Sequence, residues 1–169
     1  MFRRRKISYT PGHLGHVNIY VRNAEKAQQW YTEVLGLHTY DLIPGRAAFM
    51  TANLDESHEI AVIEVGEAAV SPQPGQVGLN HMAWRMDSLK DLEDFYNRIA
   101  ELKVPIDKVA DHGISLGIYF QDPDGNGIEV YYEMPRSEWP SKENLFSQKT
   151  LEGQFPGPWE KELATAASR

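Results

Sequence analysis

Residues 15–21 have the sequence Gly-His-Val-Asn-Ile-Tyr-Val, and residues 80–86 have the sequence Asn-His-Met-Ala-Trp-Arg-Met. In both stretches apolar side chains alternate with others, which is typical of a strand with one buried face. Each stretch carries a histidine at its second position, and these residues, His16 and His81, stand 65 positions apart. The stretches that follow match at the same offset, so the sequence predicts two copies of one structural unit.

A helix is expected after each of these strands. Asn23 is a suitable N-cap for the first helix, and Gly36 is the residue at which that helix is expected to end. Ser88 with Asp91 forms a start for the second helix that resembles a capping box. Apolar residues recur at helical spacing in both segments: Ala24, Ala27, Trp30, Tyr31, Val34 and Leu35 in the first, and Leu89, Leu92, Phe95, Tyr96 and Ile99 in the second.

Three short strand candidates follow each helix, at 37–43, 46–52 and 58–65 in the first half and at 104–110, 115–121 and 127–132 in the second. The sequence therefore predicts an α+β fold of two βαβββ modules, 13–66 and 79–133, whose strands form a curved mixed sheet in a single domain, 11–133. Residues 66–78 are rich in Gly and Pro and are expected to link the modules. Residues 134–169 are expected to form an irregular or helical C-terminal tail.

The composition of the chain excludes several classes of protein. Its 169 residues carry 17 basic and 24 acidic side chains, and the resulting net charge of -7 argues against non-specific nucleic-acid binding. There is no cysteine, which excludes disulfide frameworks, thiolate catalysis and zinc fingers. No run approaches the roughly 20 apolar residues of a membrane helix. We therefore expect a cytoplasmic protein that contacts neither nucleic acid nor membrane.

His16, His81 and Glu129 are candidate metal ligands. Glu129 lies in an otherwise apolar strand, where a carboxylate is costly to bury unless it is paired or bound to a metal. If the two modules face each other, their strands bring both imidazoles and the carboxylate to one point. Two histidines and one carboxylate with open coordination positions are typical of non-haem Fe(II) sites that bind substrate and O2. Spacing alone does not identify the metal, and a histidine in a strand is more often an ordinary core or surface residue.

A longer motif carries a family resemblance. Residues 112–129, His-Gly-Ile-Ser-Leu-Gly-Ile-Tyr-Phe-Gln-Asp-Pro-Asp-Gly-Asn-Gly-Ile-Glu, resemble the signature of type I extradiol catechol dioxygenases, which belong to the vicinal oxygen chelate superfamily. The resemblance implies that superfamily's fold and an oxidoreductase of aromatic hydrocarbon catabolism. Such an enzyme incorporates both atoms of O2 into a catechol-type substrate at Fe(II), with Mn(II) as the alternative metal. Exposed sheet edges make a homodimer or larger homo-oligomer the expected assembly.

The resemblance also assigns roles to three further residues. His58 matches the family's acid–base histidine, and His112 and Tyr119 match a pair that contacts the substrate and the ligating carboxylate. At the position equivalent to Glu129, the first module has Ala61, whereas glyoxalase I-like members are expected to carry a fourth ligand there. An apolar substrate pocket is expected, and its candidate lining residues are Tyr20, Phe49, Ala83, Arg85, Ile114, Phe120 and Tyr131.

Two other functions stay open at this point. The first is a metal-dependent isomerase or lyase of the glyoxalase type, which uses a divalent ion as a Lewis acid. Ala61, His112 and Tyr119 argue against that function. The second is a metal-free small-molecule binding protein of the drug-sequestering kind, which would have no need of a ligand triad.

Overall fold

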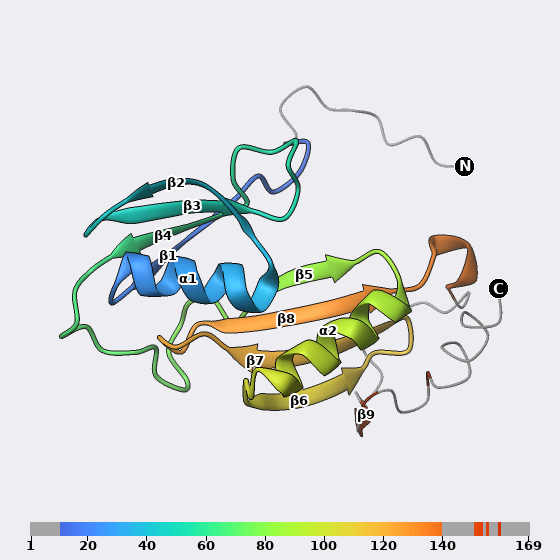
Figure 1. Cartoon of the computed structure of the whole chain (residues 1–169). Coiled ribbons are helices and arrows are strands. Elements are labelled where there is room, and N and C mark those ends of the chain that lie inside the picture. Colours follow the sequence, from blue (N-terminus) through green and yellow to red (C-terminus); the bar gives the residue numbers. More distant parts are fainter. Residues whose placement is uncertain (1–10, 140–150, 154, 156–158, 160–169) are drawn as a thin grey trace. The chain divides into compact units, whose positions relative to one another are not determined.

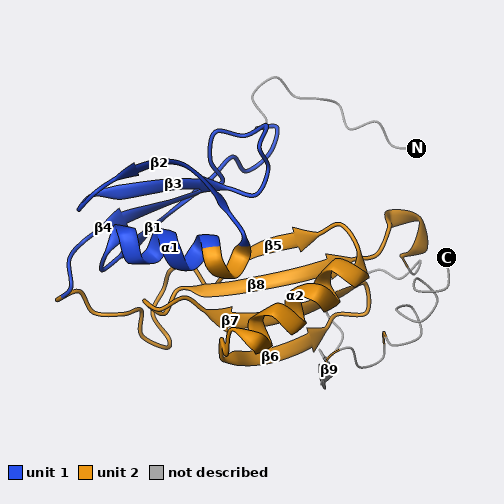
Figure 2. Ribbon diagram, viewed as in Figure 1, with its two compact units in different colours: residues 1–32, 36–67 blue, residues 33–35, 68–169 orange. Residues whose placement is uncertain are grey.

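A computed structural model describes residues 11–139, 151–153, 155 and 159 (Figure 1). The chain forms two compact units, residues 1–32 with 36–67 and residues 33–35 with 68–169 (Figure 2). No helix among the described residues has the length and hydropathy needed to cross a membrane.

The first unit contains one βαβββ module. Its elements are β1 (Val17–Val21), α1 (Ala24–Leu35), β2 (His38–Ile43), β3 (Ala47–Thr51) and β4 (Ile60–Glu64). The strands form a sheet in the order β1-β4-β3-β2, in which β1 and β4 are parallel. The Asn23 side chain caps α1 by accepting a hydrogen bond of 2.8 Å from the backbone N–H of Lys26. The helix ends at Gly36, whose φ of 72° lies in the left-handed region that favours glycine.

The second unit repeats the same plan and extends it by one strand. Its elements are β5 (Met82–Met86), α2 (Leu89–Glu101), β6 (Ile106–Asp111), β7 (Ser115–Gln121), β8 (Gly127–Glu133) and β9 (Leu151–Gly153). The strand order is β5-β8-β7-β6-β9, with β5 parallel to β8. The Ser88 hydroxyl accepts a hydrogen bond from the backbone N–H of Asp91 at the start of α2, as the capping-box motif predicts.

The core of the second unit lies between α2 and one face of its sheet. Figure 1 shows α2 lying along that sheet, and Leu92 and Ile99 of the helix are fully buried. Phe95 packs on Phe120 of β7, with 5.9 Å between the ring centroids. Because side chains alternate along a strand, Tyr119 is on the opposite face, away from α2. This second face of the sheet carries the chemistry described below.

The predicted α+β fold of two βαβββ modules is confirmed, with strand limits that differ by at most two residues from the expected ones. The first strand of each module begins just after its histidine, so His16 and His81 directly precede β1 and β5. The C-terminal tail contains a 3-10 turn at Arg136–Glu138 and the strand β9, which pairs with β6 and was not expected from the sequence. The single-domain boundary stays a prediction, and the basic residues 1–6 lie outside the described part.

Candidate functional site

Strand register identifies the internal counterpart of Glu129. In the first unit, Ala61 of β4 lies beside Asn18 of β1, and in the second unit Glu129 of β8 lies beside Ala83 of β5. Asn18 and Ala83 stand at the 65-residue offset of the repeat. Ala61 is therefore the counterpart of Glu129, as the sequence repeat predicts, and the first unit has a methyl group where the second has a carboxylate.

Glu129 is held in place by the neighbouring strand β7. Its side chain is largely buried, with 8% of the residue exposed. The Tyr119 hydroxyl donates a hydrogen bond of 2.6 Å to Oε1 of Glu129. Gly117 leaves the necessary space, because a β-carbon at that position would lie 2.3 Å from the same oxygen. The second carboxylate oxygen, Oε2, points toward His81.

His81 lies between two oxygen atoms. Its Nδ1 is 2.6 Å from Oδ1 of Asn80, and its Nε2 is 3.1 Å from Oε2 of Glu129. An amide oxygen only accepts, so Nδ1 is the donor in the first contact. If the imidazole is neutral, the lone pair of Nε2 faces the carboxylate of Glu129. Two electron-pair donors that face each other can both bind a cation placed between them.

The distance between these two atoms suits shared metal ligands. Two ligand atoms at right angles, each about 2.1 Å from one ion, lie about 3.0 Å apart. The observed separation of Nε2 and Oε2 is 3.1 Å. Asn80 fixes the imidazole through Nδ1, which is the way in which metal-binding histidines are usually oriented. His81 and Glu129 therefore fit the donor set of a divalent transition metal.

His112 extends the hydrogen-bond network of the carboxylate. Its Nε2 lies 3.0 Å from the Tyr119 hydroxyl. Since that hydroxyl donates its proton to Glu129, it accepts from Nε2 of His112. A continuous chain of donors thus runs from His112 through Tyr119 to Glu129. Burial, the hydrogen bond to Glu129 and the charge of that carboxylate raise the pKa of the Tyr119 phenol well above its ordinary value.

Tyr119 is expected to stay protonated in the metal-free protein while ordinary tyrosines ionise near pH 10. The wild type and Tyr119→Phe should therefore show equal phenolate absorbance up to about pH 11. The unfolded chain releases this proton at lower pH than the folded one, so this group lowers stability as the pH rises above about 10. The prediction would be contradicted if the phenolate absorbance that appears near pH 10 were smaller in Tyr119→Phe than in the wild type by the amount of one tyrosine.

The first unit holds its own pair of histidines. The rings of His16 and His58 lie 4.5 Å apart, and Phe49 meets His58 edge to face at 5.4 Å. Nδ1 of His58 is 3.0 Å from the Ser57 hydroxyl oxygen. In neither unit do the described residues gather three His, Asp or Glu side chains around one point. The predicted triad takes one ligand from the first unit and two from the second, and its assembly stays a prediction.

Comparison with protein families decides the affiliation of the chain. Residues 13–130 match the family model described as Glyoxalase/Bleomycin resistance protein/Dioxygenase superfamily. The chain belongs to this superfamily. The two βαβββ modules described above are the part of the chain that the family model covers.

The sequence of the chain is moderately similar to those of several named enzymes of the superfamily. The chain is 34% identical to Catechol-2,3-dioxygenase of Bacillus subtilis (strain 168) over 75% of its length, and 33% identical to Biphenyl-2,3-diol 1,2-dioxygenase 2 of Rhodococcus globerulus over 68%. It spans 44% and 60% of these two relatives. A Manganese-dependent 2,3-dihydroxybiphenyl 1,2-dioxygenase of Geobacillus genomosp. 3 is 24% identical over 75% of this chain and 38% of its own length. These relatives support an enzyme of this superfamily.

Solved structures from the superfamily show the same fold. A lactoylglutathione lyase from Agrobacterium tumefaciens aligns with a TM-score of 0.59 and 22% identity, over 73% of this chain and 95% of its own. A glyoxalase/dioxygenase from Nostoc punctiforme aligns with a TM-score of 0.62 and 21% identity, over 80% of this chain and 100% of its own. Structures named as a lyase and as a glyoxalase/dioxygenase share one architecture, so the fold alone does not identify the activity.

The expected pocket residues are spread over different environments in this superfamily member. Ile114 and Phe120 are each 1% exposed and belong to the hydrophobic core, whereas Tyr20 is 71% exposed. The guanidinium of Arg85 pairs with Glu133 at 3.4 Å. The remaining candidates are the half-buried Phe49 and Tyr131 and the exposed Ala83.

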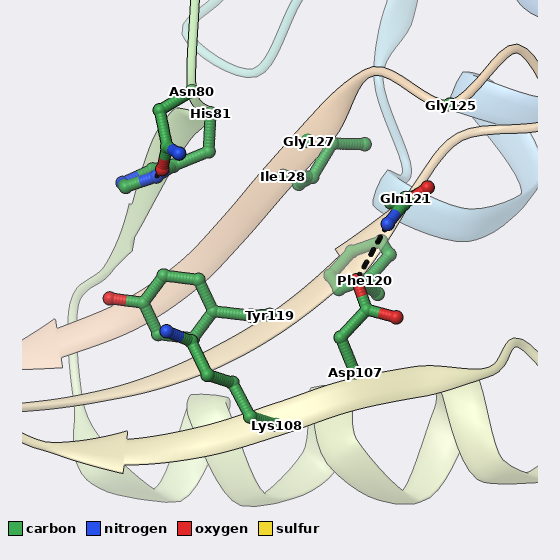
Figure 3. A pocket seen from close by; sticks show the side chains of 10 residues that line it. All are labelled: Asn80, His81, Asp107, Lys108, Tyr119, Phe120, Gln121, Gly125, Gly127 and Ile128. Carbon is green, nitrogen blue, oxygen red and sulfur yellow. Dashed lines mark hydrogen bonds between the residues drawn. The ribbon is translucent and has the colours of Figure 1, made fainter. Parts of the chain in front are cut away.

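A cavity of about 250 Å³ adjoins His81 and Tyr119 in the second unit (Figure 3). Its wall includes Lys108, which the sequence interpretation did not single out, together with Asn80. The sequence also did not predict the roles of Asn80 and Gly117, which position His81 and Glu129. A glycine inside a strand is a known signal of close approach, so Gly117 could have been noticed.

Proposed function

We propose that the protein is an extradiol dioxygenase that cleaves a catechol-type aromatic diol with O2 at a non-haem Fe(II) centre, with Mn(II) as the alternative. His16, His81 and Glu129 would hold the metal. A bound ferrous ion would keep the diol and O2 adjacent and let electrons pass between them. The names of the relatives support this reaction class, and the geometry of the second unit supports His81 and Glu129 as two of the three ligands.

The observation that carries the proposal is the alanine at the counterpart of Glu129. Ala61 is fully buried and cannot bind a metal. In this proposal the two-fold repeat would supply three ligands and not four. Three protein ligands leave coordination positions open for two diol oxygens and O2. An isomerase that uses its metal as a Lewis acid needs fewer open positions and can have four protein ligands.

The remaining side chains have distinct tasks in this proposal. Asn80 orients the imidazole of His81, and Gly117 admits the Glu129 carboxylate. Tyr119 holds its proton on the hydroxyl oxygen and keeps Oε1 of Glu129 engaged, while Nε2 of His112 supplies the next hydrogen bond. His58 is the proposed acid–base group, because its Nδ1 contacts Ser57 and its Nε2 can exchange a proton with the diol.

A metal-dependent isomerase or lyase is the second candidate function, because His81 and Glu129 could equally hold a divalent ion that acts as a Lewis acid. The decisive experiment is anaerobic loading with Fe(II) or Mn(II), followed by 3-substituted catechols in air. We expect oxygen uptake with a yellow ring-fission product. Metal binding without oxygen uptake across a broad set of diols would reject the dioxygenase in favour of the isomerase. Failure to bind metal would support the metal-free binding protein.

His58→Ala is expected to retain the metal and to lose turnover by about 10²–10⁴-fold, the usual contribution of general acid–base catalysis. Metal content and the rate of oxygen uptake measure the two effects separately. His13→Ala is the matched control, because His13 is exposed and contacts Glu56 at 3.8 Å. Loss of the metal in His58→Ala would show that this residue is a ligand and that the assignment of roles is wrong.

A further inference from the structure

The cavity beside His81 contains an unusual combination of groups. The strand segments at Phe120 and Ile128 form part of its wall, with both side chains buried in the core, and His81 and Tyr119 border it on the side of the proposed metal ligands. Lys108 and Asp107 of β6 contribute the charged groups (Figure 3). The cavity is thus bounded by the Tyr119 ring, the imidazole of His81, one ammonium group and one carboxylate.

The ammonium group of Lys108 lies over the ring of Tyr119. Nζ is 4.6 Å from the ring centroid, which is a cation–π distance. The β6–β7 register pairs the two residues, so both side chains stand on the sheet face away from α2. The hydroxyl of the same tyrosine contacts Glu129. The cation therefore lies over the face of the ring whose hydroxyl touches the ligand carboxylate.

No carboxylate of the described residues forms an ion pair with Lys108. The adjacent Asp107 is turned away, because its Oδ2 accepts a hydrogen bond of 3.0 Å from Nε2 of Gln121 (Figure 3). A one-residue irregularity in the register between Ile106 and Lys108 places Asp107 out of step with its neighbours. The positive charge on the cavity wall is consequently available to a ligand.

The part of the cavity that the second unit encloses is small. At about 250 Å³ it lies below the 300–1,000 Å³ that is typical of pockets for drug-sized ligands. One aromatic ring with a short substituent suits this space better than two linked rings. A ring whose hydroxyl groups face His81 and Glu129 would direct a substituent along Tyr119 toward Lys108.

We infer that the substrate is a monocyclic catechol that carries a carboxylate substituent, and that Lys108 is the residue that binds this carboxylate. The inference rests on the proposed dioxygenase function and specifies its substrate class. An ammonium group that donates to a carboxylate forms a charge-assisted hydrogen bond, which is stronger than a neutral one. A neutral substituent of equal size would gain nothing from Lys108.

Matched pairs of catechols test this inference. The pairs carry a carboxymethyl group or the neutral carbamoylmethyl group of equal size, at ring carbon 3 or at ring carbon 4, and they are compared with wild type, Lys108→Met and Lys108→Arg. Lys108→Met keeps the length of the side chain and removes its charge, and Lys108→Arg restores a cation. Anaerobic binding to the Fe(II)-loaded protein gives Kd, and oxygen uptake in air gives kcat and KM.

Lys108→Met is expected to raise Kd and KM for the carboxymethyl catechol about tenfold more than for the carbamoylmethyl analogue. Lys108→Arg is expected to restore most of the loss. Turnover of both analogues with no difference between the variants would overturn the inference alone. A charge preference that depends on Lys108, without turnover of any diol in air, would instead reject the proposed dioxygenase and retain the anion site.

Discussion

Replacing Glu129 by Gln is expected to abolish metal binding and ring cleavage together. The substitution keeps the shape of the side chain and leaves an oxygen that can accept from Tyr119, so the fold should be preserved. It removes the negative charge that faces Nε2 of His81 at 3.1 Å. Changes in the surroundings of a ligand already cost about 10–100-fold in affinity, and loss of a ligand charge should cost at least that. Metal analysis after dialysis and oxygen uptake measure the result.

Glu133→Gln provides the control for this experiment. Glu133 ends the same strand β8 and pairs with Arg85 at the surface of the second unit. This variant should keep its metal and its turnover. Circular dichroism of both variants shows whether each is folded. Full metal occupancy and normal oxygen uptake in Glu129→Gln would contradict the ligand assignment.

Gly117→Ala is expected to have the second-largest effect. The added methyl group would lie 2.3 Å from Oε1 of Glu129 and 3.1 Å from the Tyr119 ring. Because real β-carbons do not approach so closely, the carboxylate must leave its place and lose the hydrogen bond from Tyr119. We expect metal affinity to fall about 10–100-fold, as for other changes that misorient a ligand. Titration with Fe(II) under anaerobic conditions measures this affinity.

Gly78→Ala is the matched control for this second experiment, because a β-carbon there meets nothing within 4 Å. Thermal unfolding separates a local shift of the carboxylate from a general loss of stability. An unchanged affinity for Fe(II) in a folded Gly117→Ala protein would mean that Glu129 does not bind the metal in its observed orientation.

Local sequence signals were sufficient for most of the fold. Asn23, Gly36 and Ser88 mark helix ends through contacts within a few residues, and the structure forms those contacts. Alternation of apolar residues located the strands, because burial of one sheet face depends on a period of two. The strand β9 could not be predicted in this way. It has three residues and pairs with β6, which is about 40 positions earlier, so its own sequence contains little information about it.

The candidate site was predictable where the repeat or the motif pointed to a residue. His81 and Glu129 follow from the repeat and from a carboxylate in an apolar strand, and the structure brings them within 3.1 Å. Tyr119 and His112 came from the motif; Tyr119 donates to Glu129, and His112 contacts Tyr119. The contacts of Asn80 and Lys108 depend on strand register and on the direction of each side chain, and the sequence specifies neither. Whether His16 joins the same ion is a prediction for the experiments above.

The space around Glu129 shows what a matching carboxylate in the first unit would require. Ala47 pairs with Ile63 as Gly117 pairs with Tyr131, so Ala47 stands in the first copy where the second has glycine. A glutamate gained at position 61 would therefore collide with the Ala47 methyl group. Ala61→Glu alone would thus not reproduce the arrangement of the second unit, and Ala47→Gly would be needed with it.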